Sequence, residues 1–475
     1  MFGIWNNKDA ANLTYFALHS MQHRGQEGAG IVSGDDKKLK GYRNIGLLTQ
    51  VFNDKNILAN LTGDNAFGSV WYSSGQTKTT QNIEPLLFKF YDEHIGITMS
   101  GNLINNLSLR KSLEEDGAVF HSASDAELII HLLRRSKKKT FEEKLIDSVS
   151  KLKGAFSIVV LTQNAMYGLV DKNSFRPLVL GKLENSIVIA SETCAFNVLG
   201  AEFIDNIEAG ELVKIDNNGY EVKSYTKPGK ITVESMEFIY FARPDSTILG
   251  RNVHMVRKKT GNILAKESPV DADIVVGVPN SSLSLASGYA EEIGLPYEMG
   301  LVKNQYIGRT FINPVQNMRE LAVKMKLSAL SDVVKDKRVV LLDDSIVRGT
   351  TCFRIVKMLK NAGAKEVHVR IGSPLIMFPS FSGIDMKTSK EIRGANKTKD
   401  EICEEIGADS LEFLSIEGLK ESIGLNIDND QSGISLDIFN ASYVDGLGDN
   451  EEKFNQELTN IQKEFLKNKG VNYEQ

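Results

Sequence analysis

The sequence predicts two regions of different fold class, a strand-rich α+β region followed by an α/β region with a parallel sheet. The length of 475 residues suits two large domains or three of average size. Short β-like runs mixed with helices fill residues 1–225, whereas buried strands alternate with helices beyond a Lys-Pro-Gly-Lys sequence at 227–230. We therefore expect one domain over 1–229, a second over 230–450 and a helical tail over 451–475.

Two helices are expected in the first region. Residues 10–23 form one, because apolar Leu13, Phe16, Ala17 and Met21 recur close to one face and Gly25 follows its end. A shorter helix is expected over 126–133, where Ser-Asp at 124–125 provides a cap. Strand-like runs at 178–180 and 186–190 complete an α+β pattern.

Strand–helix alternation marks the second region. Strands are expected over 274–277, 338–342 and 367–371, with helices over 284–293 and 352–361 between them. Short apolar strands joined through helices are typical of a parallel sheet covered on both faces. A single charged helix is expected over 451–468, as a packing or solvated element rather than a catalytic one.

Composition and charge exclude several classes of protein. The net charge of −5 leaves no strong field for nucleic acid or an acidic membrane. The apolar runs are too short to span a bilayer, and the first residues show no secretory pattern. Three isolated cysteines form no disulfide framework and, by themselves, cannot supply four thiolates to zinc or iron–sulfur. This usage suits a cytoplasmic location.

The run from Arg338 to Thr351 carries the strongest functional signal. It reads as a buried strand, two acids, a turn of small residues and a helix start. Such a turn directs backbone N–H groups toward one point, where the helix dipole favours a phosphate. Adjacent carboxylates at the end of a strand can hold ribose hydroxyls and hydrated Mg²⁺. The run lacks the Lys of a nucleoside triphosphatase loop; the alternative is a capped strand-to-helix turn.

This run resembles the phosphoribosyl pyrophosphate (PRPP) motif of type I phosphoribosyltransferases. Four further segments, at 238–246, 277–282, 303–312 and 319–327, narrow the resemblance to glutamine PRPP amidotransferases, which form phosphoribosylamine at the start of purine synthesis. The similarity extends over nearly the whole chain. It implies an N-terminal, nucleophile-hydrolase-like αββα domain followed by a type I phosphoribosyltransferase α/β domain.

The resemblance implies which residues hold PRPP. Ser281, Asp343 and Asp344 match the family's Mg²⁺-associated positions, and Asp343 and Asp344 would also orient the ribose. A flexible segment rich in cations would close over PRPP and meet the leaving pyrophosphate; by itself, this segment also reads as a solvated loop. The loop residues expected at the 5-phosphate are Ser345, Ile346, Val347, Arg348, Gly349, Thr350 and Thr351, and the closing segment contributes Lys303, Tyr306, Arg309, Lys324 and Lys326.

The N-terminal half resembles the family's glutamine domain but differs from it at the residues that bind and attack glutamine. Family members begin with a Cys that attacks the glutamine amide, whereas the printed chain starts at Met-Phe-Gly-Ile-Trp. Trp71 stands where the family has an Arg that grips the glutamine α-carboxylate, and Ser100 replaces an oxyanion-hole Asn. Arg24, Gly101 and Asp125 match the family. The expectation is a degenerate glutaminase site.

The iron–sulfur branch of the family is not expected here. Its cysteine positions fall at Glu234, at Ser380 and within residues 431–442, none of which is Cys. The expected cofactor is therefore Mg²⁺, without an iron–sulfur cluster.

Two functions follow from the resemblance. The first is an amidophosphoribosyltransferase that forms phosphoribosylamine and pyrophosphate from PRPP, with ammonia rather than glutamine as the effective amine donor. The second is a non-catalytic paralogue that binds PRPP or purine nucleotides as a regulatory or scaffold subunit of an active homologue. Feedback purine nucleotides and a homodimer or homotetramer are implied by the family alone.

Overall fold

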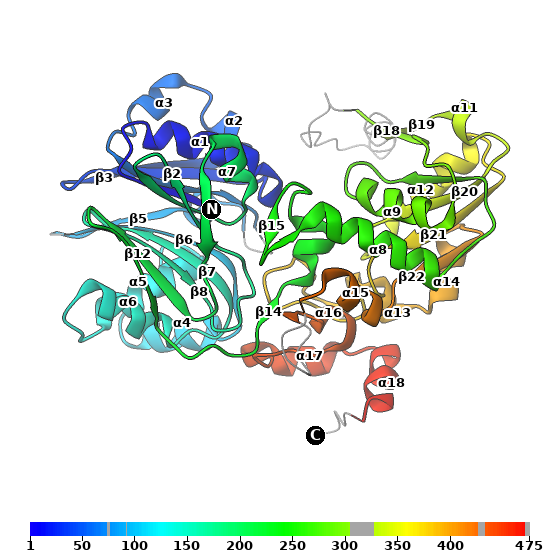
Figure 1. The fold of residues 1–475 in the computed structure, drawn as a ribbon. Helices are drawn as coiled ribbons and strands as arrows, with labels where there is room; N and C mark the ends of the chain where they lie inside the picture. The colour runs from blue at the N-terminus through cyan, green and yellow to red at the C-terminus, as the bar shows by residue number, and fades with distance from the viewer. Residues whose placement is uncertain (74–76, 92, 305–326, 426–432, 471–475) are drawn as a thin grey trace.

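The N-terminal half is a sandwich of two antiparallel sheets in this computed structural model, which describes residues 1–73, 77–91, 93–304, 327–425 and 433–470 (Figure 1). Seven described strands form one sheet and six form the other. The first has the order β11 (Glu202–Asn206), β9 (Val179–Leu183), β10 (Ser186–Ala190), β1 (Phe2–Trp5), β4 (Asn65–Trp71), β2 (Gly28–Gly34), β3 (Leu39–Ile45). The second has the order β13 (Gly219–Ser224), β12 (Glu211–Asp216), β8 (Met166–Val170), β7 (Gly154–Leu161), β6 (His94–Leu103), β5 (Leu86–Lys89).

Helices cover the outer face of each sheet and complete four layers. One apolar cluster joins α1 and α7 to the first sheet, a second fills the space between the sheets, and a third lies under α5 and α6. The αββα architecture is therefore confirmed. The helical elements of this half are α1 (Ala10–Ser20), η1 (Gln22–Arg24), α2 (Leu48–Val51), α3 (Lys55–Ala59), η2 (Thr80–Asn82), α4 (Asn106–Glu115), α5 (Asp125–Arg135), α6 (Phe141–Val149) and α7 (Cys194–Leu199).

The second half contains the expected parallel sheet. Its described strands have the order β17 (Ile274–Gly277), β20 (Arg338–Asp343), β21 (Glu366–Ile371), β22 (Ser410–Phe413), all paired in parallel. One core lies under α8, α9 and α15, and another lies under α12 and α14 on the opposite face. The covering helices are α8 (Val253–Glu267), α9 (Leu283–Ile293), α12 (Thr350–Asn361), α14 (Lys399–Ile406) and α15 (Ile416–Ile423).

Short elements complete the second half. The hairpin β18–β19 lies on either side of residues 305–326, and β14 pairs in parallel with β23. None of the described helices is both long and apolar enough to cross a membrane. The remaining elements are β14 (Thr232–Val233), η3 (Glu237–Phe241), β15 (Thr247–Ile248), β16 (Arg251–Asn252), β18 (Leu301–Lys303), β19 (Leu327–Ala329), α11 (Ser331–Val334), η4 (Ser389–Glu391), α13 (Arg393–Asn396), β23 (Gly433–Ile434), α16 (Asp437–Asn440), η5 (Gly448–Asn450), α17 (Glu451–Glu457) and α18 (Asn460–Asn468).

Three local expectations are corrected by the structure. The first helix ends at Ser20, because the chain tightens into the 3₁₀ turn η1, and Phe16 on that helix is 55% exposed instead of buried. The tail forms two helices rather than one, since Thr459 caps α18 through a capping box with Gln462. The tail packs against both halves (Figure 1), and Phe454 is buried in a small apolar cluster. The domain limits at 229 and 450 stay predictions.

Two buried carboxylates lie where β14 and β23 meet the sandwich. Glu234 accepts a hydrogen bond from the Ser382 hydroxyl at 2.5 Å, and Asp437 accepts one from Ser435 at 2.5 Å. Burial, followed by the charge of Glu234, raises the pKa of Asp437 to about 7, while Arg176 acts in the opposite direction. The iron–sulfur branch of the family has cysteines at the positions of Glu234 and Ser380. Here both residues belong to a buried hydrogen-bonded region in which Ser380 contacts Ser382.

We predict that this pair makes the protein less stable as pH rises. A carboxyl with a raised pKa in the folded state binds its proton more tightly there than in the unfolded state. Its contribution to the free energy of unfolding is therefore complete below about pH 4 and is lost as pH rises through 7. The Asp437→Asn substitution keeps an acceptor for Ser435 without the charge. It should raise stability at pH 8 by roughly 1 to 3 kcal/mol and change little at pH 5.

Thermal unfolding at both pH values provides the measurement. The exposed Asp36→Asn variant is the matched control, because its carboxylate lies in a surface turn. An equal effect of Asp437→Asn at pH 5 and pH 8 would contradict the assignment of the raised pKa to Asp437.

Candidate functional site

The phosphate-binding loop connects β20 to α12. Gly349 caps α12 with a φ of 72°, a left-handed conformation that glycine adopts without strain. Among the described residues, the backbone N–H groups from Ser345 to Gly349 find no protein acceptor. Unpaired N–H groups at the start of a helix form an anion site. The local geometry is thus the one that the sequence predicts.

Asp343 and Asp344 follow the buried strand β20. Asp343 Oδ1 accepts hydrogen bonds from the Asp344 backbone N–H at 3.0 Å and from the Ser282 hydroxyl at 3.3 Å. Asp344 Oδ1 accepts one from the Ser345 hydroxyl at 2.8 Å. Burial and the neighbouring Asp344 charge raise the pKa of Asp343, and burial also raises that of Asp344. A cation bound beside these two buried acids would therefore stabilise their ionised forms.

Ser281 and Arg257 surround the second of these acids. Ser281 follows β17, whose carboxyl end lies beside that of β20, and its hydroxyl interacts with Asp344. The Arg257 guanidinium donates to the carbonyls of Phe238 and Ala242 at 2.7 and 2.9 Å. The structure therefore brings Ser281 to the two acids, as the resemblance implies, and adds a buried cation that the sequence comparison missed.

The residues expected around PRPP are only partly described. Lys303 is exposed at the end of β18, and Arg348 forms an ion pair with Glu391 at the mouth of the loop. Ile346 is buried, whereas Thr350 and Thr351 are exposed at the start of α12. The other members of the closing segment, Tyr306, Arg309, Lys324 and Lys326, lie outside the described residues.

The N-terminal site lies between the two sheets of the sandwich. Trp71, at the end of β4, is 8% exposed and offers an indole where the family has a guanidinium. Ser100 and Gly101 lie near the end of β6, and Gly101 has a φ of 124° with no room for a side chain, because a Cβ would approach the Ala155 carbonyl oxygen to 2.1 Å. Asp125 accepts hydrogen bonds from the Leu103 backbone N–H and the Asn106 amide, each at 3.1 Å.

Sequence reasoning missed a carboxylate in this site. The Glu84 carboxylate is buried and accepts hydrogen bonds from the hydroxyls of Thr98 at 2.9 Å and Ser124 at 2.6 Å, and from the Met99 backbone N–H at 2.6 Å. Burial raises the pKa of Glu84 despite these hydrogen bonds. Its partners lie 14 and 40 positions away along the chain, so only the fold reveals the cluster.

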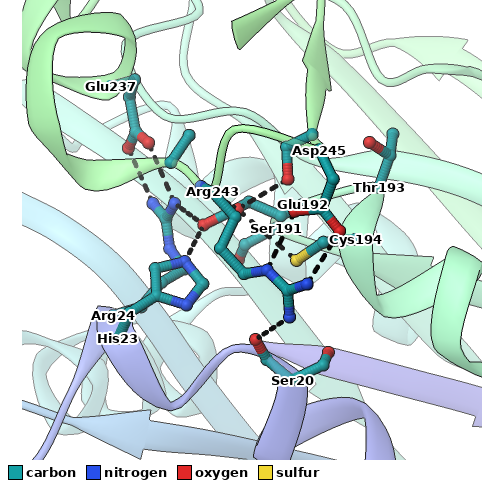
Figure 2. Close-up of polar contacts among 12 residues, drawn as sticks. Ser20, His23, Arg24, Ser191, Glu192, Thr193, Cys194, Glu237, Arg243 and Asp245 are labelled. Atoms are coloured by element: carbon teal, nitrogen blue, oxygen red, sulfur yellow. Dashed lines mark hydrogen bonds and ion pairs between the residues drawn. The ribbon is translucent and has the colours of Figure 1, made fainter. Parts of the chain in front are cut away.

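Arg24 is fully engaged in a buried ion network (Figure 2). Its guanidinium donates to Glu192 at 2.6 Å and binds both carboxylate oxygens of Glu237, at 2.7 and 2.9 Å. His23 contacts the same Glu192 oxygen at 2.7 Å, and Arg176 contacts Glu237 at 3.0 Å. Burial favours a higher pKa for Glu192, but Arg24 and His23 outweigh it and hold the pKa below its usual range. These partners leave Arg24 little capacity to bind a further anion.

One cavity connects the two ends of the site. Its volume is about 640 Å³, and its lining includes Trp71, Glu84 and Asp125 at one end and the loop from Asp343 to Cys352 at the other. Its lining also contains apolar and aromatic side chains, among them Met236, Tyr240, Phe241, Ile384 and Met386, and the charged side chains of Arg24, Arg176 and Asp385. The phosphate-binding loop and the N-terminal site therefore share one cavity.

Donor chemistry at the loop fits a hard cation. Carboxylate and hydroxyl oxygens from Asp343, Asp344 and Ser281 suit Mg²⁺, which binds to one or two protein carboxylates while substrate and water complete its shell. No cluster of three or more His, Cys, Asp or Glu side chains that could hold a metal occurs among the described residues.

Comparisons with known proteins agree with this architecture. Residues 74–198 match the glutamine amidotransferase domain family and residues 252–371 the phosphoribosyl transferase domain family. The chain is 56% identical over 471 residues to an amidophosphoribosyltransferase of Staphylococcus aureus strain MRSA252, covering 99% of this chain and 95% of the relative. It is 47% identical over 444 residues to that of Bacillus subtilis strain 168, with 93% of each chain covered.

A solved structure is similar over almost the same length. The glutamine PRPP amidotransferase from B. subtilis, complexed with ADP and GMP, superposes with a TM-score of 0.90 at 46% identity and covers 94% of this chain and 97% of its own. A structure described as the allosteric regulatory enzyme of purine biosynthesis gives the same TM-score and identity and covers 94% of this chain and 98% of its own. The chain belongs to the amidophosphoribosyltransferase family.

Proposed function

We propose that this protein forms 5-phosphoribosylamine from PRPP in purine biosynthesis, with ammonia as the effective amine donor. The observation that carries the proposal is the single cavity that joins the phosphate-binding loop to an N-terminal pocket where an indole replaces the carboxylate-binding cation. Family membership supports the reaction itself. The substituted pocket supports the choice of donor.

The phosphate-binding loop supplies what the transfer needs. The free N–H groups of residues 345–349 and the start of α12 would bind the 5-phosphate, and Asp343 and Asp344 would hold the ribose hydroxyls. Mg²⁺, when bound beside these acids and Ser281, would neutralise the pyrophosphate. Arg348 would join the loop N–H groups at the 5-phosphate, and the cationic segment, Lys303 included, would add positive charge at the pyrophosphate. These assignments are roles in our proposal.

The reaction is a displacement at the anomeric carbon. The ammonia lone pair forms the new C–N bond while the bond from that carbon to pyrophosphate breaks, which inverts the centre. The attacking nitrogen then loses one proton to give the neutral amine. Exclusion of water matters because the oxocarbenium-like carbon also reacts with water. Apolar side chains in the lining, such as Met236, Phe241 and Ile384, would help to keep water out.

The N-terminal pocket offers little to glutamine. The α-carboxylate of glutamine needs a cation, but Trp71 has none and Arg24 is already paired with Glu192 and Glu237. The carboxylate of Glu84 would repel the same group. Ser100 offers a hydroxyl in place of the family's amide donor. Ammonia requires none of these contacts.

The relatives also suggest how this protein is regulated and how it assembles, and both points belong to the proposal. The B. subtilis structure holds ADP and GMP, and purine nucleotides are the corresponding candidates for feedback control here. A homodimer or homotetramer remains a prediction from the family.

The choice of amine donor is tested by pyrophosphate release from Mg²⁺·PRPP. We expect ammonium to support release, and glutamine to give kcat/KM at least about tenfold lower, because the pocket lacks the carboxylate-binding cation. Equal or faster release with glutamine would overturn the ammonia assignment. PRPP binding without release with either donor would instead favour the regulatory-subunit alternative.

The Asp343→Asn and Asp344→Asn variants test the acids of the loop. Each removes a negative charge while keeping the side-chain shape, and we expect kcat/KM for PRPP to fall by about 100-fold or more. Steady-state kinetics at saturating ammonium and Mg²⁺ provide the measurement, with circular dichroism to verify folding. Exposed Asp36→Asn is the control, and activity within twofold of the unchanged protein would contradict the proposed role.

A further inference from the structure

The inter-sheet end of the cavity has its own polar lining. Ser69 and Trp71 extend from the same face of β4 as Phe67, which lies in the core between the sheets. Thr98 lies on the same face of β6 as Gly96, where an added Cβ would meet the Phe67 ring at 2.7 Å. Facing strands therefore direct hydroxyls and an indole into one space, which the cavity lining confirms.

Two carboxylates give this space a negative character. Glu84 is 7% exposed and Asp125 is 8% exposed, and the charge of Asp125 adds to burial in raising the pKa of Glu84. No ion pair with either is found in the described part of the chain. The cations that act on these acids do so only at longer range. Arg43 acts on Glu84, and Arg110 and Lys387 act on Asp125. Arg43 itself donates to the Pro85 carbonyl at 3.2 Å.

An unpaired hydroxyl points to a missing ligand. Ser69 Oγ is buried, with the residue 3% exposed, and has no hydrogen-bond partner among the described residues, yet Ser69 lines the cavity. A buried hydroxyl without a partner is unfavourable, so a donor or acceptor that enters this space gains a hydrogen bond. The Trp71 indole adds an aromatic surface of the kind that attracts small cations.

We propose that Glu84, Asp125, Ser69 and Trp71 form a binding site for the ammonium ion, the amine donor of the reaction. This inference rests on the proposed function and names the site where its donor enters. Ammonium offers four N–H donors and one positive charge, which match two carboxylates and a free hydroxyl acceptor. The same lining disfavours a molecule with a carboxylate.

The site also converts ammonium into a nucleophile. Ammonium transfers one proton to the Glu84 carboxylate, which leaves neutral ammonia and a carboxylic acid. Ammonia crosses the cavity and forms the C–N bond with PRPP as pyrophosphate leaves, and Glu84 returns its proton to water before the next turnover. The raised pKa of Glu84 suits this exchange, since the carboxyl then holds a proton closer to neutral pH.

The Glu84→Gln variant tests the site through kinetics. It removes the charge with little change in shape, and we expect KM for ammonium to rise by about 10- to 100-fold while KM for PRPP stays within twofold. Trp71→Arg is a second variant that places a cation in the space and should raise KM for ammonium as well. Exposed Glu114→Gln on α4 is the matched control.

Direct binding provides a readout that needs no turnover. The chain has two tryptophans, so in a Trp5→Phe background the emission of Trp71 reports on the pocket alone. Ammonium chloride should change this emission saturably at constant ionic strength, and Glu84→Gln should abolish the change. Potassium chloride, whose cation has the same charge but no N–H donors, should have at most a small effect.

The outcomes separate this inference from the proposed function. If the unchanged protein releases no pyrophosphate with ammonium, the proposed function fails, whatever the binding result. If it does release pyrophosphate but Glu84→Gln leaves KM for ammonium and the Trp71 signal unchanged, the site is wrong and the function stands. An equal response to potassium would also overturn the ammonium site, because it would show a general site for monovalent cations.

Discussion

The guanidinium of Arg24 is the contact on which the geometry of both halves depends. It lies between Glu192 of the sandwich and Glu237 at the start of the second half, and it satisfies three carboxylate oxygens at once. Buried charges are tolerated only when they are paired and hydrogen bonded. Since Glu237 also binds Arg176, the two halves are held in one relative position by groups that cannot separate without leaving carboxylates unpaired.

This constraint defines the cavity. Further hydrogen bonds cross between the halves around it, from Asn102 to the Phe381 carbonyl at 3.1 Å and from Tyr72 to Asp385 at 3.3 Å. The phosphate-binding loop is thereby placed opposite the open end of the sandwich, although the two belong to separate cores. Family resemblance explains why both halves are present, and the ion network explains how they form a single site.

Contiguous features were predictable from the sequence, and contacts across the chain were not. The loop from β20 to α12 is encoded within fourteen successive residues, 338–351, so its acids, its glycine and its helix start were all identified. The sequence placed Arg24 in the glutamine site. In the structure, however, the charge of Arg24 is already paired with Glu237, which lies 213 positions away along the chain. Glu84 was missed because the residues that surround it come from other strands and loops. Phe16 was grouped with Ala17 and Met21 on one face of the first helix, but Ala17 and Met21 are buried whereas Phe16 is 55% exposed.

The cavity carries acids at both of its ends, and its lining also contains apolar side chains and the guanidinium groups of Arg24 and Arg176. In the proposed reaction, a negatively charged molecule at the phosphate-binding loop would be repelled by Glu84 and Asp125 if it came close to them, whereas an uncharged one would not. The difference in charge would then be enough to keep the anionic reactant and the uncharged amine in different parts of the same cavity. In the proposed reaction, pyrophosphate would stay at the loop, and the supply of amine at the other end would proceed without product competing for its entrance.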